Sequence, residues 1–588
     1  MAKFGVVSLS VGKEHQLNLD NLREPELRVL SNSNIIYIYR GSKSKKIYIG
    51  QSVNFLSRHS QHYSGTEEKF NVADFDQVIV LYSTYFNGSA LDDVESQLIT
   101  YFTADNPKAK HQAVYADDYN NIINQTAGNS VNEYTEREKV ATEVVLPFWE
   151  DVLGKRGWVN TPNLDLLRTK ALVKYSPIKK LTRQQHGIID EILDKPAKSF
   201  VINGDAGTGK TVLLTHLVAE LSQKKPDAKI AIVVQPNWVK TAEEIFKVYG
   251  LNSANVVVGT SIKLVNYNKD NHIHYDTIIV DESHKLSRRG NKQHPSFNKV
   301  YEGKFSDEEN HLEILKKLGD QIVLMYDVLQ AIRPANISRT SFKSAIQDFE
   351  RRYLTTQFRI QAPAGKDYNS DDYINGIKYL LYKDTGLLAE TNFNPDFNRD
   401  VFRDGGPDAY FGYFKTEPLR NLFDWIEEDR NFNPENVDRV LAGLVEDWKQ
   451  SDGKSPAIKH WFEGSLAKRW NSTQENWVNS KDNDAEDQVG SVFAVQGIDL
   501  NRVGVLIGDD IQVNDKGILV ANKENFRNVN GKFSEEDMQL TENQEEFTLF
   551  VLNIYYILLT RGIDGIRLGF WRNDAFIEYM ERTLEINS

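Results

Sequence analysis

The hydrophobic pattern near the start of the chain is that of strands followed by a helix. Two short runs of β-branched and aromatic residues, at residues 34–39 and 45–50, flank a turn-like stretch of Gly, Ser and Lys. Runs of this kind around a turn predict a β-hairpin. Ser52 and Asn54 follow as candidate helix caps, so a helix is expected over residues 55–63.

A helical period follows at residues 89–102. Leu91, Leu98 and Phe102 fall on one apolar stripe of this segment, and Glu95 falls within the stripe. A carboxylate in such a position is costly unless it is paired or binds a metal. Glu95 is therefore a candidate functional residue.

Between residues 199 and 327 the pattern changes to continuous apolar runs separated by helical segments. Runs of this kind are typical of strands buried on both faces, and they predict a parallel sheet with intervening helices. The longest apolar stretch, residues 547–559, contains Thr548 and Asn553 and is too short to span a bilayer. It is expected to be a buried core element.

Composition limits the class of protein. At 588 residues the chain is too long for one core, and three or four units are expected. A content of 40% hydrophobic and 11% aromatic residues can fill those cores. The absence of cysteine excludes disulfides and Cys-ligated zinc. No N-terminal signal pattern is visible, and we expect a cytoplasmic protein with no membrane contact.

Charge is distributed unevenly along the chain. The formal net charge is −13, yet residues 35–62 contain five Lys or Arg, three tyrosines, two histidines and no acid. The negative net charge argues against a protein that coats nucleic acid through general positive charge, while the basic segment leaves room for a local basic groove. Together with Glu95, the segment contains the parts for metal-assisted phosphodiester cleavage. Mg²⁺ would bind Glu95, Arg58 would neutralise charge, and a tyrosine or His62 would handle the proton of water. The alternative is an aromatic hairpin with solvated lysines and a salt-bridged Glu95.

Two tyrosine tripeptides, Ile35-Ile36-Tyr37 and Tyr48-Ile49-Gly50, head this region. With the residues that follow, residues 34–130 resemble the GIY-YIG nuclease family, although Ile35 replaces the usual first glycine. The resemblance implies the following catalytic residues: Tyr37, Tyr48, Arg58, His62, Glu95 and Asn124. It also implies that Glu95 binds Mg²⁺, with Mn²⁺ as the alternative. A degenerate domain that has lost catalysis is the competing interpretation.

The segment Gly204–Thr211 reads G-x-x-x-x-G-K-T between a strand-like and a helix-like run. This context predicts a P-loop, in which backbone amides hold phosphates, Lys210 reaches the β- and γ-phosphates and Thr211 binds Mg²⁺. The glycines of the loop are Gly204, Gly207 and Gly209. Asp281 and Glu282 end a later buried strand. Asp281 is expected to hold Mg²⁺, and Glu282 to orient or deprotonate the attacking water.

Further motifs, in order behind this pair, resemble superfamily 1 helicases. The amino-acid sequences of these motifs are most similar to those of the DUF2075 or Schlafen-type DNA/RNA helicase-like ATPases, over residues 180–580. The resemblance implies that Gln185 reads adenine and that Gln330, with Asp327, senses the γ-phosphate. It implies that Arg359 and Arg561 stabilise the transferred phosphoryl group. It places motif V at Gln496, Gly497 and Asp499. A surface salt bridge is the alternative for each arginine taken alone.

These observations predict an α/β multidomain fold, with a small α+β GIY-YIG-like nuclease domain followed by two RecA-like P-loop lobes with parallel sheets. The predicted divisions are an N-terminal lead (1–33), the nuclease-like domain (34–130) and a helical and basic connector (131–180). A first lobe follows with the P-loop (Walker A) and the Asp281–Glu282 pair (Walker B) (181–383), and then a second lobe with motif V and with motif VI, which contains Arg561 (384–588).

The expected function is that of an ATP-dependent nuclease-helicase, which engages or translocates on nucleic acid and cleaves its backbone with a divalent metal. DNA is favoured as the substrate, with RNA as the alternative, and family analogy suggests anti-phage defence as the setting. In a second hypothesis the ATPase half is a switch or sensor that gates the nuclease without unwinding. In a third, a helicase carries a nuclease-like module that only binds. ATP, Mg²⁺ and nucleic acid are the predicted partners, and homo-oligomerisation is left open.

Overall fold

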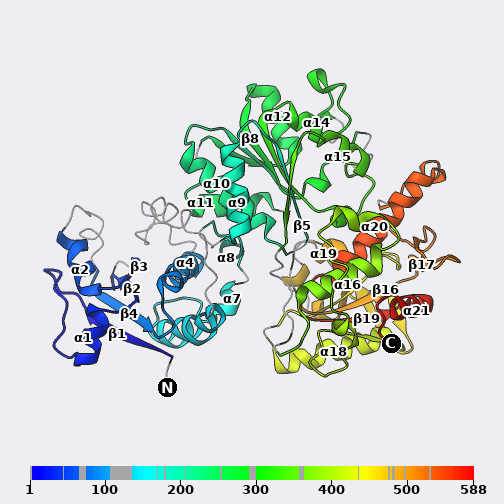
Figure 1. The fold of residues 1–588 in the computed structure, drawn as a ribbon. Helices are drawn as coiled ribbons and strands as arrows, with labels where there is room; N and C mark the ends of the chain where they lie inside the picture. The colour runs from blue at the N-terminus through cyan, green and yellow to red at the C-terminus, as the bar shows by residue number, and fades with distance from the viewer. Residues whose placement is uncertain are drawn as a thin grey trace.

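The computed structural model describes residues 3–43, 46–64, 75–105, 136–168, 170–177, 181–205, 207–236, 238–251, 254–289, 299–355, 363, 365–434, 436–449, 451–474, 477–479, 484–495, 498, 500–528 and 531–587. Figure 1 shows three parts in chain order. A small N-terminal part, in blue, is joined by cyan helices to a green α/β lobe, and a second lobe, in yellow to red, follows. The fold is therefore α/β and multidomain, as predicted.

The N-terminal part is an antiparallel sheet with helices against it. The strands, in sheet order, are β1 (Phe4–Ser10), β4 (Gln77–Ser83), β2 (Ile35–Arg40) and β3 (Ile47–Ser52). Its helices are α1 (Glu24–Ser31), α2 (Phe55–Ser64) and α4 (Gly88–Asp105). The predicted hairpin is β2–β3, with Tyr37 opposite Gly50. Because β1 pairs with β4, the sheet begins inside the segment that the sequence division left as a lead.

The connector is helical and buries an apolar face. Its elements are α6 (Arg137–Val140), the π-helical turns η1 (Ala141–Val145) and η2 (Phe148–Gly154), α7 (Leu164–Arg168) and α8 (Ala171–Lys174). Val144, Phe148 and Trp149 are fully buried in a core that runs without a break from Ile36 to Phe200. The N-terminal part and the first lobe therefore share one hydrophobic core.

The first lobe has an all-parallel sheet with helices on its faces (Figure 1). The strands, in sheet order, are β10 (Glu350–Leu354), β5 (Phe200–Gly204), β9 (Gly319–Tyr326), β8 (Tyr275–Val280), β6 (Ile230–Val233) and β7 (Val256–Gly259). The helices are α9 (Arg183–Asp194), α10 (Lys210–Lys224), α11 (Val239–Val248), α12 (Ser261–Asn271), α14 (His311–Lys316) and α15 (Arg339–Ala345). The apolar runs at residues 199–327 form the strands predicted from them.

The second lobe has a larger sheet that is parallel except at one edge. The strands, in sheet order, are β11 (Phe411–Phe414), β19 (Gly562–Phe570), β16 (Leu500–Ile507), β12 (Arg439–Ala442), β15 (Gln488–Gly490), β14 (Leu466–Trp470) and β13 (Trp461–Glu463). Strands β13 and β14 form an antiparallel hairpin, which the expectation of purely parallel sheets did not include. A separate hairpin is made of β17 (Ile511–Val513) and β18 (Leu519–Ala521).

Helices cover the second sheet and fill the space toward the first lobe. They are α16 (Ser370–Tyr382), α17 (Asp400–Arg403), α18 (Pro418–Phe432), α19 (Val492–Val495), α20 (Thr541–Leu559) and α21 (Asp574–Thr583). Helix α20 contains the long apolar stretch and is buried from Phe550 onward, as expected of a core element. Helix α16 contacts α20 and α21, so it packs on the second lobe, although the division at residue 383 placed it in the first. Among the described residues, no helix is long and apolar enough to cross a membrane.

Candidate nuclease and nucleotide sites

The hairpin β2–β3 and helix α2 bring together three of the predicted nuclease residues. The hydroxyl of Tyr37, on β2, lies 2.8 Å from His62 Nε2 on α2. The ring of Tyr48, on β3, stacks on Tyr37 at 6.2 Å between centroids and meets His62 edge-on at 5.3 Å. Tyr37 and His62 are almost fully buried, and Tyr48 is partly exposed. The rigid strand pair and the capped helix therefore hold a tyrosine-histidine pair next to a more accessible tyrosine.

Two charged residues act on this pair. Burial raises the pKa of Tyr37 to about 12, and a hydrogen bond with Arg58 and its charge oppose that rise. The charge of Glu95 raises the pKa of Tyr37 further, so the Glu95 carboxylate, on α4, is close enough to act on the same hydroxyl. Tyr37 is consequently a neutral phenol at pH 7. It can orient a water molecule or share a proton with His62, but it is not ionised itself.

Gly50 has a steric reason for its place in the second tripeptide. A Cβ atom on Gly50 would lie 2.5 Å from Tyr37 Cζ. The Tyr37 ring is confined by Tyr39 and Phe55, so it has no free direction in which to move. Ile35, at the first tripeptide's glycine position, is fully buried in the same cluster. The first position therefore tolerates a large side chain, whereas the second one does not.

Glu95 has a second carboxylate beside it. Gln51 Nε2 donates to Glu95 Oε2 at 2.9 Å and to Asp92 Oδ1 at 2.7 Å. Leu91 and Leu98 are buried on α4 as predicted, and Glu95 is partly exposed at the edge of that stripe. Mg²⁺ is commonly bound by one or two carboxylates, with water and phosphate oxygens completing its shell. Glu95 fits that role, while no group of three or more His, Asp or Glu that could hold a metal occurs among the described residues.

The P-loop joins β5 to α10, as the motif predicts. Gly207 and Gly209 have φ angles of 87° and 84°, which only glycine adopts readily. Lys210 Nζ donates to the carbonyl of Gly204 at 2.5 Å and to that of Asp205 at 3.0 Å, and lies 3.5 Å from Asp327 Oδ2. Thr211 is the second residue of α10, so its hydroxyl lies at the helix N-terminus, where phosphate is favoured.

Asp281 and Glu282 lie directly after β8. Burial and the neighbouring charge of Glu282 raise the pKa of Asp281 above its usual value. Burial acts against ionisation of Glu282 as well, but the charges of Lys285 and other nearby cations lower its pKa below the usual value. Arg561 is one of those cations, although it comes from the second lobe, directly after α20. Glu282 is thus held in its ionised form, as a hydrogen-bond acceptor with a cation from each lobe in its field.

Gln330 and Gln185 both lie against the phosphate-binding elements. Gln330 Nε2 donates to Asp327 Oδ2 at 2.6 Å, which places the predicted γ-phosphate sensor next to Lys210. Gln185 Oε1 accepts from the backbone of Thr182 at 3.0 Å, and its Nε2 donates to the carbonyl of Thr208 at 3.3 Å. The start of α9 is therefore tied to the P-loop through Gln185.

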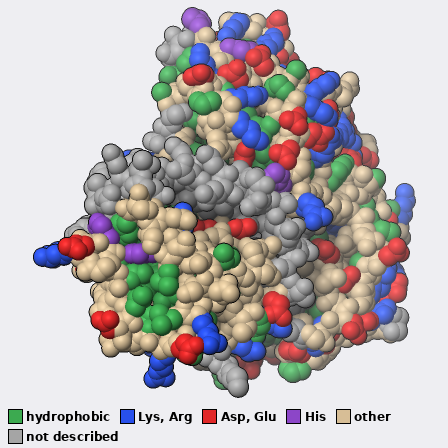
Figure 2. Space-filling model, turned by 60° about the vertical axis from the view of Figure 1, so that its left-hand side comes forward, with side chains coloured by type: hydrophobic (Ala, Val, Ile, Leu, Met, Phe, Trp, Pro, Cys, Tyr) green, Lys and Arg blue, Asp and Glu red, His purple; other side chains and the backbone are tan. Residues whose placement is uncertain are grey.

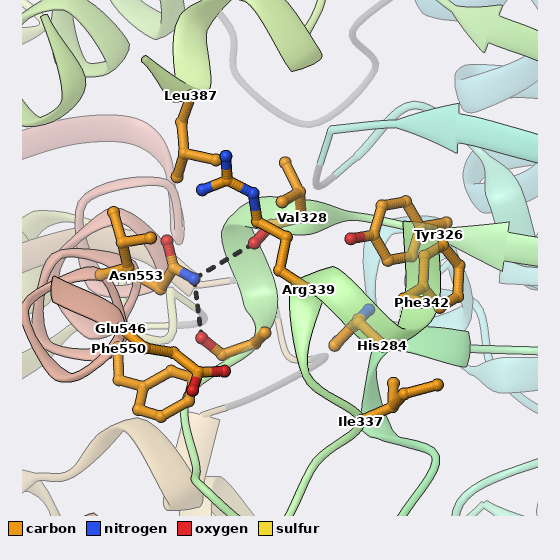
Figure 3. Close-up of a pocket in the computed structure, with 12 residues that line it drawn as sticks. His284, Tyr326, Val328, Ile337, Arg339, Phe342, Leu387, Glu546, Phe550 and Asn553 are labelled. Atoms are coloured by element: carbon orange, nitrogen blue, oxygen red, sulfur yellow. Dashed lines mark hydrogen bonds between the residues drawn. The ribbon is translucent and has the colours of Figure 1, made fainter. Parts of the chain in front are cut away.

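The lobes also meet beside the segment that follows β9, at a pocket shown in Figure 3. Asn553, on α20, donates to the carbonyls of Val328 at 3.1 Å and Ala331 at 2.7 Å. Tyr326 stacks on Phe342 at 4.1 Å between centroids on the opposite wall. The segment that contains Gln330, the predicted γ-phosphate sensor, is thus held by a helix of the second lobe.

The surface in Figure 2 has the N-terminal part turned toward the viewer. On this face Lys and Arg side chains are scattered among Asp and Glu, and an apolar patch lies on the N-terminal part.

Of the predicted site residues, five lie outside the described residues, and their roles stay expectations: Asn124, Arg359, Gln496, Gly497 and Asp499. Sequence reasoning missed Asp92 and Lys285. Lys285 follows Glu282 by three residues, a proximity that was readable from the motif.

Comparison with known proteins gives the class and then the family. Residues 33–108 match the GIY-YIG catalytic domain. Residues 197–571, more than half of the chain, match the Schlafen group 3, DNA/RNA helicase domain. The chain therefore belongs to the Schlafen group 3 helicase-domain family and carries a GIY-YIG domain in front of that region.

One curated relative is an uncharacterized protein of Saccharomyces cerevisiae, YPL245W. It is 26% identical over 396 residues, which cover 62% of this chain and 80% of that protein. Among solved structures, the Hef helicase domain of Pyrococcus furiosus matches with a TM-score of 0.30 and 12% identity, over 68% of this chain and 97% of that one. The Pif1 helicase of Candida albicans matches with a TM-score of 0.27 and 13% identity, over 69% and 99%. Scores of this size add nothing to the family assignment.

Proposed function

We propose that the protein is an ATP-dependent nuclease that uses a superfamily 1-type ATPase to engage nucleic acid and cleaves its phosphodiester backbone in the N-terminal domain. The observation that carries the proposal is the convergence of Tyr37, His62, Arg58 and Glu95 in one GIY-YIG domain. This domain shares a core with a lobe that contains a complete P-loop and Asp-Glu pair. DNA is the favoured substrate, RNA the alternative, and anti-phage defence the setting that family analogy suggests.

In the nuclease domain each residue has a defined task. Arg58 offsets the charge that develops on the scissile phosphate. His62 and Tyr37 share a proton and so can take up the proton of the attacking water. Mg²⁺, or Mn²⁺, held by Glu95 would polarise the phosphate and stabilise the leaving oxygen.

In the ATPase half the P-loop amides and Lys210 would hold the phosphates, and Thr211 and Asp281 would hold the accompanying Mg²⁺. Neighbouring cations keep Glu282 ionised, so its carboxylate orients the attacking water by accepting a hydrogen bond from it. Arg561 comes from the other lobe, so hydrolysis would require the lobes to be closed. In a competing proposal the same parts act as a switch that gates the nuclease without unwinding.

The proposal is tested with purified full-length protein and labelled single- and double-stranded DNA and RNA, with and without ATP and Mg²⁺. Glu95→Gln should lower cleavage by about 100-fold or more while ATP hydrolysis is retained. Lys210→Ala should abolish ATP hydrolysis. Cleavage that is unchanged in Glu95→Gln contradicts the assigned nuclease site. Cleavage of long duplexes at the full rate in Lys210→Ala contradicts coupling, and ATP hydrolysis without strand displacement favours the switch.

A further inference from the structure

A fully buried lysine of the second lobe reaches into the phosphate-binding loop. Lys378, on α16, has no exposed surface, and its Nζ lies 2.5 Å from Asp205 Oδ2. The same Nζ donates to the carbonyl of Asn392 at 2.7 Å. Asp205 directly follows Gly204 at the end of β5, so this ion pair connects a helix of one lobe to the P-loop of the other.

Asp205 places the ion pair directly beside the expected phosphate site. The backbone carbonyls of Gly204 and Asp205 both accept from Lys210 Nζ, the group that is expected to bind the phosphates. Burial raises the pKa of Asp327, which lies 3.5 Å from Lys210, and the charge of Asp205 raises it further. A carboxylate this close to the phosphate site repels a triphosphate unless a cation offsets its charge. Lys378 is that cation.

Helix α16 also supports the other side of the nucleotide site. The hydroxyl of Tyr382, one turn after Lys378, donates to Asn553 Oδ1 at 2.7 Å. Asn553 in turn donates to the carbonyls of Val328 and Ala331, in the segment that contains Gln330. One helix of the second lobe is therefore connected both to the P-loop and to the γ-phosphate-sensing segment.

The complete burial of Lys378 argues for a role beyond packing. An ammonium group that is withdrawn from water requires a well-placed partner, and a hydrophobic side chain would fill a purely structural position at lower cost. Resting on the proposed ATPase function, we propose that Lys378 is a positioning residue of the nucleotide site. It neutralises the charge of Asp205 so that the P-loop accepts a triphosphate. It also connects the loop to α16, so that nucleotide binding changes the dynamics of this helix in the second lobe.

The test compares Lys378→Met, Asp205→Asn and the double variant in the full-length chain, by binding of a fluorescent ATP analogue and by steady-state ATP hydrolysis. Lys378→Met should weaken nucleotide binding and raise KM by about tenfold or more, with a smaller change in kcat, because Asp205 is left uncompensated. Asp205→Asn should bind at least as tightly as the wild type. The double variant, which has neither buried charge, should regain near wild-type affinity.

The matched control is Lys366→Met, which breaks the ion pair of Lys366 with Asp404 in the second lobe and should leave nucleotide binding unchanged. If Lys378→Met does not fold, the double variant decides, since loss of affinity there contradicts charge compensation. Wild-type affinity in folded Lys378→Met also overturns the role of Lys378. Absence of binding to the wild-type protein would overturn the ATPase function as well.

The link to the second lobe has its own readout. Hydrogen exchange in the peptide containing residues 370–382 should slow when the ATP analogue binds the wild-type protein. It should not slow in Lys378→Met at saturating nucleotide. Exchange that does not respond to nucleotide in the wild type would show that the ion pair transmits nothing to α16.

Discussion

At the scale of single residues, the second lobe contains a carboxyl group that titrates near neutral pH. Asp510 is fully buried just after β16, and it accepts a hydrogen bond from the hydroxyl of Tyr555. Burial raises its pKa to about 7. Since an unfolded aspartate has a pKa of about 3.9, folding takes up a proton at Asp510 between these two values.

The stability that this proton provides is present below pH 4 and is lost as pH rises toward 7. Asp510→Asn keeps an acceptor for Tyr555 and removes the charge, so it should stabilise the protein at pH 8, by on the order of 2 kcal/mol, and much less at pH 5. Thermal unfolding at both pH values measures the difference. The exposed Asp515→Asn is the control and should change little at either pH. An equal effect of Asp510→Asn at pH 5 and pH 8 would exclude the titration.

At the scale of secondary-structure elements, the pairing of β2 with β3 positions the tyrosines of the two tripeptides in the GIY-YIG domain. Tyr37 faces Gly50 across the hairpin, and Tyr39 faces Tyr48. Because side chains of a strand alternate between faces, Tyr37 and Tyr39 point to the same face of β2, where Tyr37 meets His62 and Tyr39 meets His59. The local sequence pattern predicted the hairpin correctly. The contact of Gly50 with the Tyr37 ring across the two strands explains why the second tripeptide ends in glycine.

Gly50→Ala should destabilise the N-terminal domain by about 1–3 kcal/mol, because the new methyl group overlaps the confined Tyr37 ring. Urea unfolding, followed by tyrosine fluorescence or hydrogen exchange in β2, provides the measurement. Gly88→Ala is the matched control, since a Cβ there meets nothing within 4 Å. The nuclease rate should fall in Gly50→Ala even where the domain is folded, as Tyr37 is displaced from His62. A neutral Gly50→Ala would mean that the ring relaxes freely.

At the scale of the whole molecule, the connector makes the N-terminal part and the first lobe one structural unit. Trp149 is fully buried and meets Phe102 edge-on at 5.0 Å, while its Nε1 donates to the carbonyl of Thr161 at 3.0 Å. Further along, the hydroxyl of Tyr249 in the first lobe donates to the carbonyl of Leu172 in the connector at 2.6 Å. A GIY-YIG domain attached in this way is not free to move like a domain on a flexible linker.

Trp149→Ala should cost about 3–5 kcal/mol and should increase hydrogen exchange in β2 and in β5 together. Strand β19, in the second lobe, should keep its protection. Trp461→Ala, which removes a buried tryptophan of the second lobe, is the control with the reverse pattern. Loss of protection in β2 alone would show that the shared core does not couple the two parts.

The sequence by itself determined the features that depend on neighbours in the chain. Periodicity and contiguous motifs are enough to predict four of them: the tyrosine hairpin, the glycine loop between β5 and α10, the Asp281–Glu282 pair at a strand end and the apolar stripe of α4. These features predicted the fold class and the first candidates for both sites, but they did not indicate Asp92 or Lys285.

Only the tertiary structure decided which of those residues act on one another. The amide of Gln51 joins Asp92 to Glu95, Arg561 lies in the field of Glu282, and Lys378 reaches Asp205 from 173 residues away. Such contacts depend on how strands, helices and lobes pack, and a single sequence carries no measure of distance between them. A buried lysine on α16 looks like any other helix residue until the fold places an aspartate beside it.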